Sequence, residues 1–389
     1  MENRTGIFTN GIIWFGVAIS VSEIEAGIQI ASSASIDSLW IPLVLGHILG
    51  GILLFFVGLI GARLRKNAME TTVSAFGKYG SKFFASLNVL QLIAWVSVLN
   101  AQGALAIVSL NLPISFELTS AILAALVAVW VYIGLQKSSK LTTGVMTVLI
   151  ALLVVMSVNL LTIGHTGTIS TSNTLSFWNI FEISIAMPVS WLPVISDYTK
   201  DVKDPVNASL VSAAAYTVAS LWMYFMGIAI VGIGTKSIAQ SILMMGLGTP
   251  GVIILVLSTV TTNFLATNSA GESAKSIYNR LNPKTVGVIV SVMSIVIAVS
   301  GIMNHYIDFL YLISSVFAPM AAVLMVSFYL DKSDDETAWK WNIFAWLMGF
   351  IVYQIAGFYD SIFLGPSLLS IVVSAALAYL RVFLKKQAY

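Results

Sequence analysis

The chain has 389 residues, of which 9% are charged and 58% are apolar, and its formal net charge is +2. Soluble globular domains carry about 25% charged residues, so this composition, with a mean hydropathy of +0.93, excludes a water-soluble protein. The absence of cysteine excludes disulfide bonds. We expect a lipid bilayer around the chain and no nucleic-acid partner.

Long apolar stretches recur from one end of the chain to the other. A helix needs about 20 mostly apolar residues to cross a bilayer, and its backbone polar groups must pair within the helix. The sequence predicts about twelve such spans, at residues 9–33, 40–62, 83–110, 114–135, 141–164, 176–197, 206–233, 250–271, 285–303, 307–330, 341–358 and 362–384. We therefore predict an all-α polytopic membrane protein, with residues 1–389 forming one integral membrane domain.

The basic residues predict how the chain is oriented. With the N-terminus in the cytoplasm, all of the 19 Lys and Arg residues except Lys236 fall on the inner side. Basic residues favour the cytoplasmic side of a membrane protein. Removing one span from the middle would reverse every later loop and destroy this pattern. We predict a multi-pass protein of the cell (inner or plasma) membrane with both termini in the cytoplasm.

Ionisable residues and helix breakers lie inside the first and sixth spans. Glu23 and Glu25 lie in the middle of the first span, beside Ser and Gly residues that tolerate an unwound stretch. The sixth span contains Glu182 and two prolines, Pro188 and Pro193, each of which removes a backbone donor. Acidic groups within a span are functional candidates. Interrupted helices five spans apart are typical of inverted-repeat transporters.

Two further spans have polar faces. In the third span, polar residues recur at helical spacing: Asn88, Gln91, Trp95 and Gln102. The eighth span has a cluster of hydroxyl and amide side chains: Ser258, Thr261, Thr262 and Asn263. Indole and amide groups suit a flat heteroaromatic ring, and neighbouring hydroxyls suit a small cation. The alternative is structural, because Ser and Thr also join membrane helices to one another. We interpret His47 in the second span as a packing residue.

Several segments resemble one transporter family. Residues Ser190–Lys200, which read SWLPVISDYTK, resemble the end of helix 6 in the nucleobase:cation symporter-1 family. Thr261-Thr-Asn263, followed by Ser269-Ala-Gly271, resembles helix 8 of its cytosine permease branch, and Trp14–Glu23 resembles its helix 1. Leu87–Gln91 and the Glu23-Ile24 pair resemble the hydroxymethylpyrimidine transporter branch.

The resemblance implies a fold and a set of binding residues. The fold is a five-plus-five inverted repeat, as in sodium-coupled amino-acid transporters, plus two C-terminal helices. The repeats would cover about 9–164 and 176–330, and the extra helices about 341–384. A sodium ion would meet the carbonyls of Ala18, Val21 and Ser258 and the hydroxyls of Thr261 and Thr262. The family's substrate residues fall on Ser22, Trp95, Ser190 and Trp191. We add Glu23, Gln91 and Asn263 to the substrate-binding set.

Two departures from the family pattern argue against cytosine itself. Cytosine permeases continue after the helix 8 motif with an acidic and amide-rich run, whereas this chain has Phe264-Leu-Ala266. A Gln that follows the helix 3 Trp in some relatives is Leu99 here. Glu23 would supply a polar anchor in their place.

We therefore expect a sodium symporter for a pyrimidine or nucleobase-like solute, with hydroxymethylpyrimidine or a related thiamine precursor as the best guess. The ring would stack between Trp95 and Trp191 and bond to Glu23 and Gln91. The alternatives are a proton-coupled nucleobase or cytosine permease, an amino-acid or amine carrier on the same fold, and a channel. No metalloprotease motif, nucleophile elbow or phosphate loop supports an enzyme. We expect no cofactor besides the coupling ion, and the oligomeric state stays open.

Overall fold

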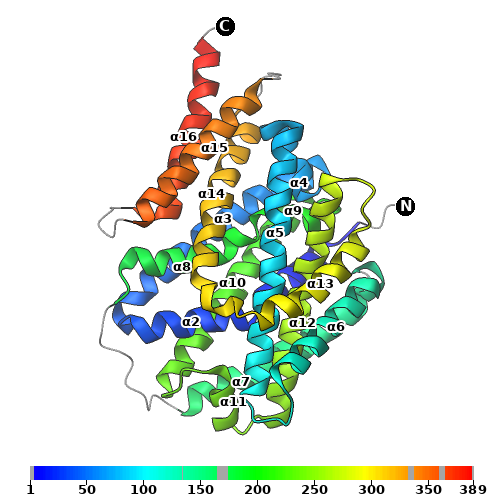
Figure 1. Ribbon diagram of the computed structural model, residues 1–389. Coiled ribbons are helices and arrows are strands. Elements are labelled where there is room, and N and C mark those ends of the chain that lie inside the picture. Colours follow the sequence, from blue (N-terminus) through cyan, green and yellow to red (C-terminus); the bar gives the residue numbers. More distant parts are fainter. Residues whose placement is uncertain (1–3, 134, 164–173, 332–336, 359–363, 388–389) are drawn as a thin grey trace.

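The computed structural model describes residues 4–133, 135–163, 174–331, 337–358 and 364–387, and these residues are almost entirely helical (Figure 1). The first half contains α1 (Ile7–Ala18), α2 (Val21–Ser33), α3 (Ile36–Leu64), α4 (Ala68–Thr71), α5 (Val73–Val108), α6 (Phe116–Ile133) and α7 (Leu135–Ile163). The second half contains α8 (Phe177–Ser190), α9 (Leu192–Thr199), α10 (Pro205–Gly232), α11 (Ile238–Met244), α12 (Gly248–Ile277), α13 (Pro283–Val299), a 3-10 turn (Ile302–His305), α14 (Tyr306–Tyr329), α15 (Ala338–Gly357) and α16 (Pro366–Gln387).

The structure confirms an all-α polytopic chain. Over the described residues, every predicted span coincides with a helix or a pair of consecutive helices, and the predicted positions 134, 164 and 362–363 lie outside the described residues. Among the described residues, nine helices are long and apolar enough to cross a membrane, or ten when α1 and α2 count as one bent span. The remaining predicted spans correspond to α13, which is shorter, and α15.

Some helix ends differ from the prediction because a helix continues beyond its apolar part. The third span was placed at 83–110, whereas α5 begins at Val73 and passes a non-helical joint at Gly77. Lys78 and Lys82 lie in this added segment, so hydropathy alone does not mark it as part of the span. Likewise α12 runs to Ile277, past Glu272 and Lys275. The short helices α4 and α11 and the 3-10 turn were not predicted.

Helices that are distant in the chain pack into two groups. In one group α10 contacts α1, α2 and α3, and α3 contacts α8 and α9. In the other group α12 and α13 contact α5 and α6. The helices α14, α15 and α16 pack against one another, and Figure 1 shows α15 and α16 together at one side of the molecule. The two groups meet where α1 contacts α12 and where α2 contacts α5 and α12.

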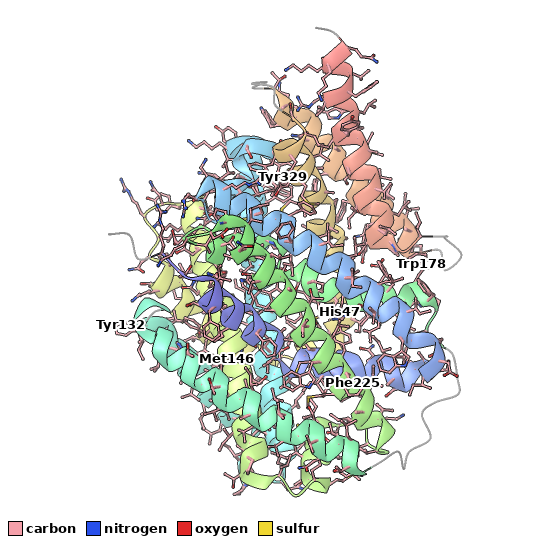
Figure 2. All side chains as sticks on the ribbon, turned by 180° about the vertical axis from the view of Figure 1, so that it is seen from behind. His47, Tyr132, Met146, Trp178, Phe225 and Tyr329 are labelled. Carbon is pink, nitrogen blue, oxygen red and sulfur yellow. The ribbon has the colours of Figure 1, made fainter. Side chains whose placement is uncertain are left out.

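The distribution of apolar and polar side chains is typical of a protein that lies in a lipid bilayer. Large apolar residues remain exposed on the outer faces of most helices, as for Leu90, Val129 and Val296. Polar residues instead gather in the interior. His47 is buried among the helices whereas Tyr132 points away from the molecule (Figure 2). Because lipid favours apolar outer surfaces, the interior polar groups are the candidates for a functional site.

Candidate functional site

The first span is broken in the middle of the bundle. Helix α1 ends at Ala18, α2 begins at Val21, and the two helices are bent by 49°. Ser20 has an extended backbone, and its hydroxyl accepts a hydrogen bond of 3.2 Å from the backbone N–H of Glu23. This N-cap stabilises the start of α2 as a new helix after the break. The carbonyls just before it are therefore released from regular helical pairing, as the Ser-rich and Gly-rich sequence predicted.

The sixth span has a smaller interruption. Helix α8 ends at Ser190, α9 begins at Leu192, and Trp191 lies between them with φ −96° and ψ −5°. The two helices together still qualify as one span over Phe177–Thr199. The carbonyl of Ser190 accepts a hydrogen bond of 3.1 Å from Nε2 of Gln91. An amide from α5 thus satisfies a backbone carbonyl at the interruption.

Hydroxyl groups of α12 approach the break in the first span. Ser258 Oγ donates to the carbonyl of Ile19 at 3.0 Å, and Thr262 Oγ1 lies 3.4 Å from the carbonyls of both Val17 and Ile19. Thr261 differs, because its hydroxyl donates to the carbonyls of Leu257 and Ser258 in its own helix. The result is a buried cluster of neutral oxygens at the meeting point of the two helix groups.

The sodium site predicted from the sequence shares Ser258 and Thr262 with this oxygen cluster, but the carbonyls that they meet belong to Val17 and Ile19 rather than to the predicted Ala18 and Val21. Ala18 and Val21 flank the break, and Ser258 and Thr262 contact it, whereas the carbonyl of Ser258 is engaged by Thr261. Within the described residues, no three His, Asp or Glu side chains gather to hold a metal ion. A site made only of carbonyl and hydroxyl oxygens suits a monovalent cation, and unwound helices supply such carbonyls in transporters.

The amide groups of α5 face the broken sixth span, and the indole of Trp95 packs against α14. Nε2 of Gln91 donates to Asn88 as well as to Ser190, but its Oε1 atom makes no hydrogen bond in the described structure. Trp95 lies one turn further along α5 and is 4% exposed, and its indole N–H also has no partner there. Asn263 on α12 is buried with an unpaired Oδ1. Buried polar atoms are normally paired, so these atoms indicate a place for a polar ligand.

The two predicted stacking indoles belong to different aromatic clusters. Trp95 contacts Phe309 edge-on with ring centres 5.3 Å apart, whereas Trp191 contacts Trp14 edge-on at 6.0 Å. Ser22 lies in the first turn of α2, and its hydroxyl donates a hydrogen bond to Oε1 of Gln102 on α5. The structure thus brings the predicted substrate residues to the helices around the break, but it pairs the two indoles with other rings.

Glu23 points towards α10 rather than towards Gln91. Its Oε1 atom accepts a hydrogen bond of 2.8 Å from the Tyr216 hydroxyl, and its Oε2 atom accepts one of 2.7 Å from Ser220. Ser220 also lies 2.7 Å from Nε2 of His47, whose Nδ1 atom is 2.6 Å from Ser184. A continuous buried network therefore joins α2, α10, α3 and α8.

Tyr216, Ser220 and Ser184 were not predicted as site residues from the sequence. A signal existed, because Ser212, Tyr216 and Ser220 recur at a spacing of four residues on one face of α10. His47 is a fully buried packing residue, as interpreted, with both ring nitrogens bonded. Glu182 lies elsewhere, where it bonds to Ser367 at the start of α16.

Comparisons with known proteins agree with this arrangement. The model of a family described as permease for cytosine/purines, uracil, thiamine and allantoin matches residues 2–338. The chain is similar to the cytosine permease of Escherichia coli strain K12, with 22% identity over 340 residues that cover 86% of this chain and 80% of that permease.

Solved structures show the same fold. The inward-facing conformation of Mhp1 matches with a TM-score of 0.76 and 19% identity, and covers 99% of this chain and 92% of that one. Mhp1 in a closed conformation with bromovinylhydantoin bound, a nucleobase-cation-symport-1 family transporter, gives 0.70 at 20% identity, over 98% and 93% of the chains. An outward-open Na⁺-coupled sialic acid symporter gives 0.73 at 13% identity, over 98% and 91%. The predicted fold class is confirmed.

Proposed function

We infer the function from one premise: this chain belongs to the family of permeases for cytosine and purines, uracil, thiamine and allantoin. It is a secondary transporter of nucleobase-like solutes that works by alternating access, and it is not an enzyme. We propose further that it imports hydroxymethylpyrimidine or a related thiamine precursor, and that a sodium ion drives the uptake.

The observation that carries the substrate proposal is the pair of unsatisfied polar atoms on α5. Gln91 and Trp95 lie one turn apart on α5, and neither Gln91 Oε1 nor Trp95 Nε1 has a partner in the described residues. A buried polar atom without a partner costs about 1–3 kcal/mol. An aminopyrimidine offers a donor for the amide oxygen and an acceptor for the indole N–H. An aminopyrimidine would therefore bind here without breaking any hydrogen bond of the protein.

The oxygen cluster at the broken first span supports sodium as the coupling ion. Thr262 and Ser258 already approach its carbonyls. A cation held there would bind α12 to the break and hold α1 and α2 in one relative orientation. Since Ser22 directly follows this break, sodium would preorganise the substrate site, and substrate would in turn raise the affinity for sodium. Movement of the α1–α3, α8–α10 group against the α5, α6, α12 and α13 group would then expose the site to each side.

A second candidate is proton coupling at Glu23. This carboxyl group is 2% exposed and bonded only to neutral partners, Tyr216 and Ser220, in the described structure. A buried acid with hydroxyl partners can exchange a proton. In this case a pH gradient alone would drive uptake.

The test is uptake of labelled hydroxymethylpyrimidine by proteoliposomes under a sodium gradient, a pH gradient, or neither. We expect the sodium gradient to drive accumulation. In Thr262→Val, the sodium concentration for half-maximal uptake should rise by about tenfold or more, as for loss of one polar contact to a charge. The control is Thr147→Val, because the exposed Thr147 hydroxyl donates to the carbonyl of Thr143 in its own helix and is not among the residues that approach the break.

Three results would contradict parts of this proposal. Uptake that does not depend on the sodium gradient but is driven by the pH gradient would favour the proton-coupled candidate. An equal effect of Thr262→Val and Thr147→Val would reject the sodium site. Competition by amino acids but not by pyrimidines would assign the chain to the amino-acid or amine carriers.

A further inference from the structure

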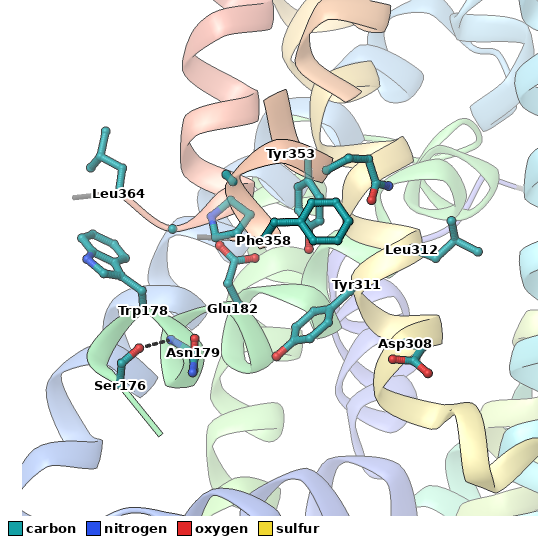
Figure 3. Close-up of a pocket in the computed structure, with 15 residues that line it drawn as sticks. Ser176, Trp178, Asn179, Glu182, Asp308, Tyr311, Leu312, Tyr353, Phe358 and Leu364 are labelled. Atoms are coloured by element: carbon teal, nitrogen blue, oxygen red, sulfur yellow. Dashed lines mark hydrogen bonds between the residues drawn. The ribbon is translucent and has the colours of Figure 1, made fainter. Parts of the chain in front are cut away.

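A pocket of about 550 Å³ lies away from the breaks in the first and sixth spans, where α8, α14, α15 and α16 meet (Figure 3). None of the residues that we assign to substrate or sodium lines it. In the predicted topology α8 and α16 begin, and α15 ends, at the outer face of the membrane. The pocket is therefore separate from the transport site and would be reached from outside the cell.

The pocket is acidic. Glu182 and Asp308 line it, and its described lining contains no Lys, Arg or His. Glu182 is 3% exposed and accepts hydrogen bonds from the backbone N–H and the hydroxyl of Ser367, at 2.8 and 2.6 Å. These groups belong to the first turn of α16, whose positive end stabilises a negative charge. Asp308 stands at the exposed rim, 3.8 Å from His305. A buried carboxylate thus faces the pocket without a basic side chain opposite it.

Aromatic side chains surround this carboxylate. Trp178 approaches from α8, Tyr311 from α14 and Tyr353 from α15, and in Figure 3 the two tyrosine rings flank Glu182. The ring of Tyr353 is 4% exposed, and its hydroxyl makes no hydrogen bond in the described structure. Ring faces attract organic cations, and the free hydroxyl offers one hydrogen bond to a polar group on the same ligand.

We propose that this pocket binds a small organic monocation of the alkylammonium class, with its charge between Glu182 and the rings of Tyr311 and Tyr353. The acidic charge and the aromatic walls favour this class over an anion or a neutral heterocycle. An inorganic cation would use the carboxylates but would gain little from the three rings. The pocket is a second ligand site on the transporter, distinct from the site at the broken helices.

The probe is choline, and its matched control is 3,3-dimethylbutan-1-ol, which has the same shape and hydroxyl but carries no charge. Binding is measured by isothermal titration calorimetry on the purified full-length protein, without sodium and without pyrimidine. Choline should bind at least about tenfold more tightly than the alcohol. Glu182→Gln should weaken choline binding by about tenfold or more, and Tyr353→Phe should weaken it by a few fold. Glu117→Gln, an exposed acid at the start of α6, should leave it unchanged.

Three results would overturn the proposal. They are equal affinities for choline and the alcohol, no choline binding to the wild type, or choline binding that survives Glu182→Gln but is lost in Trp95→Leu. The last result would place choline in the transport site. If Glu182→Gln does not fold, Tyr311→Leu removes one ring wall without touching Ser367, and undiminished choline binding to it would equally reject the pocket. Since the titration measures no uptake, its failure leaves the proposed function standing.

Discussion

The helices α2 and α10 cross so closely that two glycines touch the opposite backbone. A Cβ atom at Gly27 would lie 2.4 Å from the carbonyl oxygen of Tyr224 and 2.9 Å from its Cα. A Cβ atom at Gly227 would lie 2.2 Å from the carbonyl oxygen of Ile24. These neighbours are backbone atoms, so no side chain can rotate out of the way. Small residues permit such close crossings of membrane helices, and here the crossing positions Glu23.

Gly27→Ala should therefore force the two helices apart. Ordinary contact begins at 3.4 Å, so the backbones must separate by about 1 Å to accept the methyl group. Overpacking of this kind lowers the free energy of unfolding by about 1–3 kcal/mol. The same movement would stretch the bonds from Tyr216 and Ser220 to Glu23, which are 2.8 and 2.7 Å long. We expect lower thermal stability together with reduced uptake.

The assay is thermal unfolding of the purified protein in detergent, followed by tryptophan fluorescence. The control is Gly144→Ala in α7, where a Cβ atom would meet nothing within 4 Å. Its melting temperature should stay unchanged or rise, because Ala favours a helix over Gly by about 0.5–1 kcal/mol. If Gly27→Ala melts at or above the temperature of Gly144→Ala, the close crossing of α2 and α10 is refuted.

Two other predictions concern polar contacts. Ser220→Ala should lower the free energy of unfolding by about 1–3 kcal/mol, because it leaves Oε2 of Glu23 and Nε2 of His47 each without its buried partner. Ser209→Ala on the same helix removes a buried hydroxyl that has no partner in the described structure, so equal melting temperatures of the two variants would contradict the network. Lys200 and Glu272 form an ion pair at 3.0 Å, with side chains 24% and 23% exposed. A double-mutant cycle with Lys200→Met and Glu272→Gln, measured by chemical unfolding, should give a coupling of only about 0.2–1 kcal/mol, and several kcal/mol would show that solvent does not screen the pair.

Composition and hydropathy pattern predicted the architecture of this chain because few kinds of backbone structure can cross a bilayer. An apolar stretch long enough to cross lipid must be a helix, so the spans follow from hydropathy. The interruption of the first span also followed from local chemistry, since Ser20 and its neighbours favour a fresh helix start. The prolines of the sixth span predicted a break as well, although the break there covers only Trp191.

Only the tertiary structure decided which side chains meet. Ser258 reaches Ile19 across 239 residues, and Glu23 meets Tyr216 across 193. Most of these helices are apolar on all sides, so their sequences carry little sign of which face turns towards lipid and which towards protein. The rotation of each helix is set instead by close packing, as at Gly27 and Gly227. For this reason the sequence could name Glu23 as a candidate functional residue, but it could not show that its carboxylate points towards α10.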